Sequence, residues 1–161
     1  MTEEKTMVLS SLMNTVSIQQ QTNELLACNK VTASYGLTLT RQQAAALITT
    51  RTEVLKSTGR IEFSGGIAGD LVLAFCDSPY ISQENYEDTL HQLIELFYSF
   101  KNETSDQVSD ADLIEYMKNA FNGPCSGSME LLADRELPAL AQKTNNNRFT
   151  DIIKEMEITD E

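Results

Sequence analysis

The stretch SQENYEDTLHQLIELFYSFK, residues 82–101, decides the fold. At about 100° per residue, one broad arc of a helix collects its apolar side chains: Tyr86, Leu90, Leu93, Ile94, Leu96, Phe97 and Phe100. The opposite arc collects polar side chains, among them Glu84, Glu87, Asp88, His91, Glu95 and Ser99. A stripe about half a turn wide contacts several neighbours at once. The pattern therefore predicts a central helix at about 82–102.

Weaker patterns predict further helices over residues 10–30, 40–58, 67–77, 109–122, 129–137, 138–143 and 150–156. Thr40 and Gln43 have the spacing of a capping box, Gly59 is expected to end the helix over 40–58, and Ser82 and Ser109 are expected N-caps. The residues expected to point inward are Ala44, Leu47, Ile48 and Val54/Leu55 in the helix over 40–58 and Leu113, Ile114, Met117 and Phe121 in the helix over 109–122. Residues 60–63 alternate like a strand, but no second strand exists to pair with them, so we expect an extended connector there. Residues 29–39 hold Tyr35-Gly36, where glycine permits the left-handed conformation that closes a helix. We therefore predict an all-α single domain over residues 1–161, built from six or seven helices around the central one.

The first predicted helix has an apolar stripe that changes face partway along its length. Such a helix bends, changes packing partners, or leaves its first half to pack on another protein. Residues 1–20 are thus candidates for an appendage, and residues 158–161 are expected to form a frayed acidic tail.

Composition places the chain among soluble proteins of the cytoplasm. Its 161 residues, 41% of them hydrophobic, are enough for one core. The beginning MTEEK is not a secretion signal, and the longest apolar run, residues 71–76, is far too short to span a membrane. The cysteines Cys28, Cys76 and Cys125 form no CxxC pair, and a single histidine rules out the usual zinc patterns.

The formal charge of −12 is unevenly distributed along the chain. Residues 1–60 carry six Lys and Arg against four Asp and Glu, so the excess of negative charge follows residue 60. This field repels phosphate backbones and excludes nucleic-acid binding as an expected function. The acidic surface either confers solubility alone or steers a basic partner toward the protein.

Individual residues offer weak signals of chemistry. His91 falls on the solvated face of the central helix, where Glu87 and Glu95 favour an ion-pair cluster over a general base or a metal ligand. Cys76 ends a buried helix, where a thiol acts as a small apolar group. Cys125 precedes a helix, whose amides can stabilise a thiolate, although acidic surroundings oppose this.

Two further motifs are weighed as anion or cation sites. Gly65, Gly66 and Gly69 form a GGxxG before a helix, but no lysine follows them and carboxylates flank them, so close packing explains the glycines better. Asp106, Asp110 and Asp112 lack the central glycine and the last glutamate of a calcium loop. No metal, cofactor or catalytic residue is therefore expected.

Three strings distinguish the chain: CNKVTASYGLTLT at residues 28–40, GRIEFSGGIAGDLVLAFCDSPYISQENYEDTLHQLIELFYSFKNE at residues 59–103, and GPCSGS at residues 123–128. With them, the chain resembles a family of small bacterial proteins of unknown function. The resemblance covers about residues 25–132 and brings no activity. It implies a bacterial cytoplasmic setting and a second uncharacterised protein as partner.

Two functions are therefore carried forward. The first is a non-enzymatic module that binds another protein or a second copy of itself, through the acidic surface or through an apolar patch of Leu9, Leu12, Met13 and Val16. The second is a small-molecule or thiol-dependent function in which Cys76, Asp77 and Tyr80 meet Cys125 from a later turn. The first function is preferred because the sequence contains no recognisable set of catalytic residues.

Overall fold

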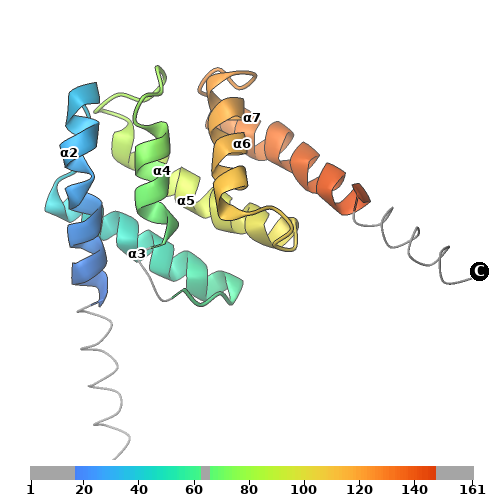
Figure 1. Cartoon of the computed structure of the whole chain (residues 1–161), viewed down its shortest axis with the longest axis horizontal. Coiled ribbons are helices and arrows are strands. Elements are labelled where there is room, and N and C mark those ends of the chain that lie inside the picture. The colour runs from blue at the N-terminus through green and yellow to red at the C-terminus, as the bar shows by residue number, and fades with distance from the viewer. Residues whose placement is uncertain (1–16, 63–65, 148–161) are drawn as a thin grey trace, which may run out of the picture. The chain divides into compact units, whose positions relative to one another are not determined.

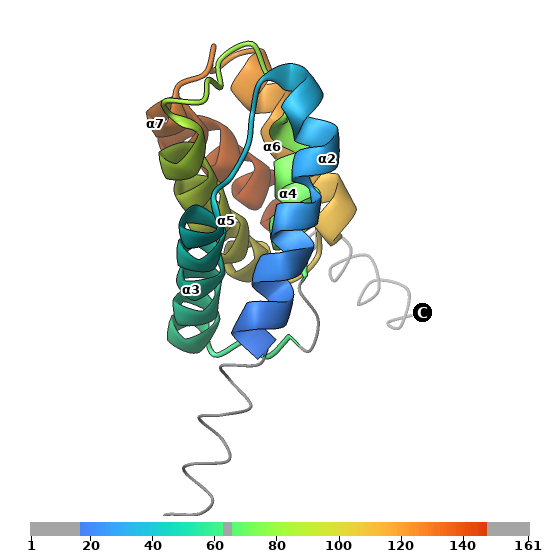
Figure 2. The ribbon, with the colours of Figure 1, turned by 90° about the vertical axis from the view of Figure 1, so that its left-hand side faces the viewer.

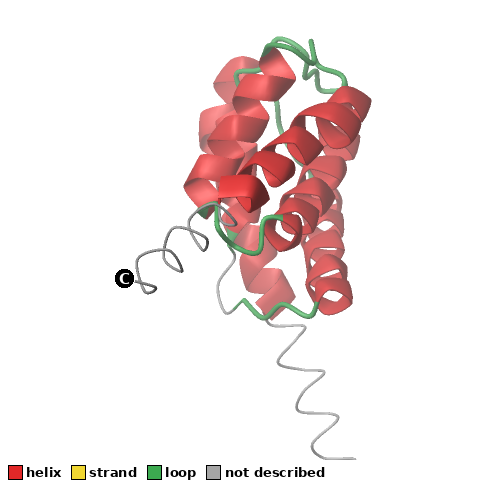
Figure 3. Ribbon diagram, turned by 90° about the vertical axis from the view of Figure 1, so that its right-hand side faces the viewer, coloured by secondary structure: helices red, strands yellow, loops and turns green. Residues whose placement is uncertain are grey.

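The computed structural model describes residues 17–62 and 66–147. Within these residues every regular element is a helix, as Figure 1 and Figure 3 show, so the predicted all-α fold is confirmed. The chain divides into two compact units at Glu95 and Leu96. The first unit contains everything up to the middle of helix α5, and the second contains the rest.

The first helical run is longer than expected. Residues 17–27 are helical, and helical backbone continues through Cys28 into α2 (Asn29–Thr32) and the 3-10 helix η1 (Ala33–Tyr35). Gly36 ends the run in the left-handed conformation, with φ of 79°. The side chain of Asn29 then holds the backbone of Leu39: its Oδ1 accepts a hydrogen bond from the Leu39 amide at 2.8 Å, and its Nδ2 donates one to the Leu39 carbonyl at 2.9 Å.

Helix α3 (Arg41–Thr58) begins and ends as the sequence predicts. Thr40 and Gln43 form a capping box, in which each side chain accepts a hydrogen bond from the other residue's backbone amide. Gly59 terminates the helix with φ of 69°. Of the expected inward residues, Ala44, Leu47, Ile48 and Leu55 are buried and Val54 is half-buried. Arg51, which lies on the same inward stripe, is buried as well.

Helix α4 (Ile67–Phe75) is shorter and less buried than predicted. Most of its apolar side chains are buried: Ile67, Ala68, Leu71, Val72 and Phe75. Leu73, however, is 43% exposed, so the expectation that only Asp70 would face solvent is wrong. A nine-residue helix packed on one side of a small unit keeps a solvent face even when its sequence is almost entirely apolar.

The predicted central helix is α5 (Tyr86–Glu103), and it begins later than Ser82. Residues 82–85 form a turn, in which the Ser82 amide donates to Oδ1 of Asn85 at 2.9 Å. The Thr89 amide then donates to the Asn85 carbonyl, so Asn85 precedes the first helical residue. Of the predicted stripe, all but the half-buried Leu96 are buried: Tyr86, Leu90, Leu93, Ile94, Phe97 and Phe100. Tyr98, which the pattern missed, is buried too.

The second unit is built on the end of α5 and on α6 (Asp110–Asn122). The Ser109 side chain accepts a hydrogen bond from the Asp112 amide, which confirms the predicted N-cap. The predicted inward residues of α6, Leu113, Ile114, Met117 and Phe121, are all buried. The helix ends at Gly123 and Pro124, as expected.

The last described helix is continuous where two short helices were predicted. It comprises α7 (Met129–Leu131), a π-helical segment η2 (Leu132–Glu136), and helical residues 137–147. Pro138 has no amide hydrogen, and its ring collides with the carbonyl of the preceding turn in an α-helix. The wider π turn, in which the Leu137 amide donates to the Leu132 carbonyl, accommodates this proline without breaking the helix.

Candidate functional site

The corner after α4 holds three of the predicted site residues. Cys76 is buried and its thiol donates to the Leu73 carbonyl at 3.2 Å. Asp77 and Tyr80 are exposed, Tyr80 by 41%. Asn85 supports this corner by donating from its side-chain amide to the Tyr80 carbonyl at 3.2 Å. The corner thus presents a carboxylate and a phenol to solvent while it hides the thiol.

A second group of polar side chains lies inside the first unit, and no motif in the sequence indicates it. The hydroxyl of Tyr86 is buried and has no hydrogen-bond partner. Burial raises the pKa of Tyr86 to about 12, against a lowering effect of the Thr32 hydroxyl and small raising effects of Cys76 and Cys28. The Thr32 hydroxyl itself donates to the Leu37 carbonyl at 2.7 Å.

Cys28 is the least buried of the three cysteines. Its thiol donates weakly to the Glu24 carbonyl at 3.8 Å and lies against Gly69 of α4, where an added Cβ atom would be 3.7 Å from the sulfur. Burial and the nearby Asp70 carboxylate both raise the pKa of the Cys28 thiol. The thiol is therefore accessible but poorly ionised at neutral pH.

Cys125, the remaining predicted site residue, belongs to the second unit and is buried there. Burial raises the pKa of its thiol and Glu136 raises it further, while Arg135 acts in the opposite direction. The π segment surrounds this position: the Arg135 guanidinium donates to the Pro124 carbonyl at 3.1 Å, and the Tyr116 hydroxyl donates to the Glu136 carbonyl at 2.9 Å. Because Cys76 and Cys125 lie in different units, their meeting stays a prediction.

His91 is less solvated than its sequence position indicates. The predicted ion pair to Glu87 is present, with 3.7 Å between Nε2 and Oε1. The other ring nitrogen, Nδ1, is hydrogen-bonded to the hydroxyl of Thr50 on α3 at 2.8 Å, and only 26% of the side chain is exposed. The His91 imidazole thus contacts a hydroxyl through one ring nitrogen and a carboxylate through the other, and the bond to Thr50 joins α3 to α5.

Arg51 forms a buried ion pair that no sequence pattern predicted. Its guanidinium donates to Oε2 of Glu62 at 2.7 Å and to Oε1 of Gln21 at 3.0 Å. Gly66 lies directly against this pair, because an added Cβ atom would be 2.7 Å from both charged groups. The signal was the position of Arg51, four residues from Leu47 and four from Leu55 on the inward face of α3.

Lys101 occupies the centre of the acidic loop that was weighed as a calcium site. Its ammonium donates to the Val108 carbonyl at 2.6 Å, and it lies 2.9 Å from Oδ1 of Asp110 and 3.9 Å from Oδ1 of Asp106. The lysine thus supplies positive charge to this loop from within the chain. Among the described residues, no group of three or more His, Cys, Asp or Glu side chains is arranged to hold a metal ion.

The remaining candidates, Leu9, Leu12, Met13 and Val16, lie outside the described residues. In the part of the chain that is described, no helix combines the length and the apolar character that crossing a membrane requires.

Comparison with known proteins gives a family but no activity. No curated protein and no solved structure matches the chain. A family model matches residues 24–150, which includes nearly all of the described residues of both units and extends beyond the 25–132 expected from the sequence strings. The chain therefore belongs to a family of unknown function, DUF6323.

Proposed function

We propose that the protein is a non-enzymatic module that binds another protein. The observation that carries this proposal is the set of large apolar side chains that the described residues leave exposed: Val31, Tyr35, Ile61, Leu73, Tyr80 and Leu131. Five of these six belong to the first unit. Apolar side chains gain free energy when a partner removes them from water, so exposed ones can supply the contacts of an interaction surface.

The reactive groups support a binding role over catalysis. A nucleophilic cysteine needs a thiolate, but burial raises the pKa of the Cys125 and Cys28 thiols. Cys76 is buried and bonded to a backbone carbonyl. The His91 imidazole is already engaged by Thr50 and Glu87.

Charge favours one class of partner for the proposed interaction. The first unit carries six Lys and Arg against eleven Asp and Glu, and the second carries six against thirteen. Both units are therefore acidic, which favours a partner with a basic surface and speeds its association at low ionic strength. Among the described residues the three cysteines form no disulfide, which fits a reducing compartment, so we propose the bacterial cytoplasm as the setting of this interaction.

Quantitative co-purification from the organism of origin tests the proposal. The tagged chain, expressed at its natural level, is expected to migrate on size exclusion in a complex larger than itself, with one other protein in a fixed ratio. Raising the salt concentration during the separation should weaken that complex, because exposed charges are screened. Migration of the chain alone at every salt concentration would contradict the proposal.

A further inference from the structure

The helical run of residues 17–35 and helix α4 lie side by side and point in the same direction (Figure 1 and Figure 2). The contacts agree with this direction. Near the beginnings of both helices, Arg51 bonds to Gln21 and touches the position of Gly66. Further along both, Cys28 contacts Gly69. Cys28 and Gly69 therefore mark the line along which the two helices face each other.

Helical geometry places two exposed apolar residues on the same side of this line. At about 100° per residue, Val31 is rotated by about −60° from Cys28, and Leu73 by about +40° from Gly69. In two parallel helices the contact residues point toward each other, so a residue rotated one way on the first helix and a residue rotated the other way on the second lie on the same side of the contact. Val31 and Leu73 therefore share one side. Thr32 is rotated by about +40° from Cys28, and Val72 by about −60° from Gly69, so both point to the other side of the contact. That side is buried, since Thr32 is 0% exposed and Val72 is 2% exposed.

The solvent side of this contact is apolar at its centre. Val31 is 51% exposed and Leu73 is 43% exposed. Tyr35, four residues after Val31, is 55% exposed. Cys28 and Gly69, both half-buried, form the floor between them. We name this surface the α2–α4 seam, made of residues Glu24, Cys28, Val31, Tyr35, Gly69, Asp70 and Leu73.

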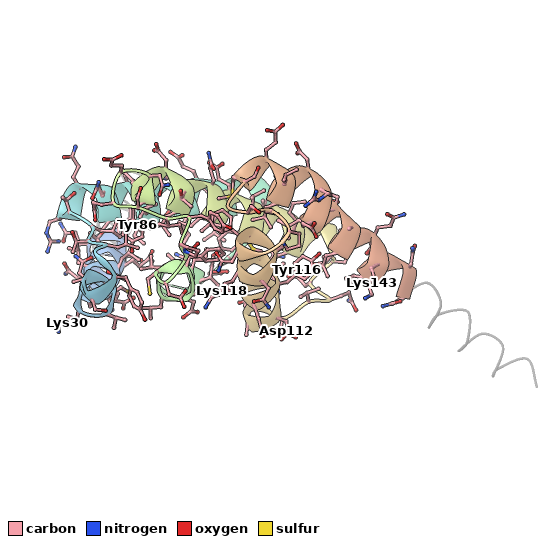
Figure 4. The ribbon with its side chains drawn as sticks, turned by 90° about the horizontal axis from the view of Figure 1, so that it is seen from above. Lys30, Tyr86, Asp112, Tyr116, Lys118 and Lys143 are labelled. Carbon is pink, nitrogen blue, oxygen red and sulfur yellow. The ribbon has the colours of Figure 1, made fainter. Side chains whose placement is uncertain are left out.

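The edges of the α2–α4 seam are acidic. Glu24 precedes Cys28 by one turn, and Asp70 follows Gly69, so both carboxylates fall on the solvent side and both are exposed. Lys30 is the basic residue nearest to Cys28 in the sequence. It is rotated by about 160° from Cys28 around the helix and points away from the unit (Figure 4). A partner must therefore bring the positive charge.

We infer that the α2–α4 seam binds an amphipathic helix of another protein, whose apolar stripe is flanked by Lys and Arg. This inference rests on the proposed function and specifies its surface and the chemistry of its partner. Two parallel helices present a row of side chains into which a third helix packs, with anchors at every third or fourth residue. A second copy of this chain is a poor occupant, because a two-fold contact would bring like carboxylates together in a chain of charge −12.

Three synthetic peptides of about 18 residues test the seam, since this length is enough to form a helix against a surface. The first has a leucine stripe flanked by lysines, the second has the same stripe flanked by glutamates, and the third has the composition of the first in scrambled order. Fluorescence anisotropy is expected to give saturable binding of the first peptide only. Equal binding of the first and third peptides would overturn the proposal, and so would no binding of the first.

Variants locate the binding on the seam. Leu73→Glu and Val31→Glu are each expected to weaken binding of the leucine–lysine peptide by about tenfold or more. Leu131→Glu is the matched control, because Leu131 is an exposed leucine of the second unit, and it should leave the affinity unchanged. Asp70→Lys should weaken the lysine peptide and improve binding of the glutamate peptide. Equal effects of Leu73→Glu and Leu131→Glu would refute the seam.

Alkylation of Cys28 gives a readout that requires no variant. A maleimide reagent should modify Cys28 before the buried Cys76 and Cys125, and saturating leucine–lysine peptide should slow that reaction by about tenfold if it covers the floor of the seam. An unchanged rate in the presence of bound peptide would place the peptide elsewhere on the protein.

The natural partner separates failure of this inference from failure of the proposed function. If wild type and Leu131→Glu retain the co-purified protein and Leu73→Glu loses it, both statements hold. If Leu73→Glu retains it as well as wild type does, the seam is wrong while the binding function stands. If wild type captures no protein, the proposed function itself fails.

Discussion

The two units of the protein bury a positive charge in different ways. In the first unit, Arg51 is 2% exposed and joins Gln21, thirty residues earlier, to Glu62, eleven residues later. In the second unit, the Lys101 side chain is 8% exposed, and its ammonium bonds to the Val108 carbonyl and to Asp110, at the end of the loop that follows it. One cation therefore connects three segments of its unit, while the other closes a single loop.

The difference teaches what each cation stabilises. An arginine has five donors in a fixed plane, so it can satisfy two side chains from distant segments at once. A lysine ammonium is a point charge that suits the carbonyls and carboxylates of a compact turn. We expect loss of Arg51 to weaken the whole first unit and loss of Lys101 to loosen residues 102–110 alone.

The largest effect is expected from Arg51→Ala, which should lower the free energy of unfolding by about 3 kcal/mol, because it leaves the Glu62 carboxylate without its buried partner. Urea titration measures the loss, and hydrogen exchange should accelerate through the first unit. The double variant Arg51→Met/Glu62→Met should recover most of the loss. A double variant no more stable than Arg51→Ala would show that the pair is not the cause.

Gly66→Ala should follow, with a loss of about 2 to 3 kcal/mol. Its φ of 62° and ψ of −143° belong to a region that is essentially restricted to glycine, and the new methyl group would collide with the Arg51–Glu62 pair. Gly59→Ala is the matched control, because its φ is also positive but nothing lies within 4 Å of the new atom. The control should lose only about 1 kcal/mol. Equal losses of unfolding free energy in the two variants would mean that Arg51 and Glu62 move away from the methyl group without an energetic cost.

Tyr86 extends the comparison to a buried polar group without any partner. Its pKa of about 12 in the folded state exceeds the ordinary value of 10, so its contribution to stability is fully present below pH 10 and is lost as the pH rises toward 12. Relative to Tyr86→Phe, wild type should lose about 2 to 3 kcal/mol over this range. Parallel pH dependences of the two proteins in urea titrations would show that the hydroxyl is not buried as described.

Lys101→Ala should give the smallest effect, about 1 to 2 kcal/mol, because Asp110 is more than half exposed and regains water when the lysine is removed. Hydrogen exchange should accelerate within residues 102–110 and hardly elsewhere. Acceleration that spreads through both units would contradict the local role of this lysine.

Much of the fold could be predicted from local patterns. The capping box at Thr40, the terminating Gly59 and the N-cap Ser109 were identified because a cap depends on residues only three positions apart. The late start of α5 and the exposure of Leu73 could not be found in this way. The start of α5 depends on a turn in which Asn85, and not Ser82, precedes the first helical residue. The exposure of Leu73 depends on how many neighbouring helices cover α4.

The candidate surfaces were less predictable than the helices. Asp77 and Tyr80 were identified as candidate site residues of a corner between helices, and the structure shows that both face solvent. Nothing in the spacing of Cys28 and Gly69 indicates that these two residues touch across two helices. The bond between Thr50 and His91 likewise joins residues 41 positions apart. Contacts of this kind depend on the packing of whole helices, which periodicity along one helix does not encode.

By itself, the sequence determined the helical class, most helix ends and the acidic character of the protein, because these follow from side chains a few positions apart and from composition. Only the tertiary structure decided that Arg51 is buried with Glu62, that Pro138 sits in a continuous helix behind a π turn, and that Val31 and Leu73 share one exposed seam. The physical reason is that burial and pairing depend on which surfaces meet, and distant segments meet only when the chain has folded.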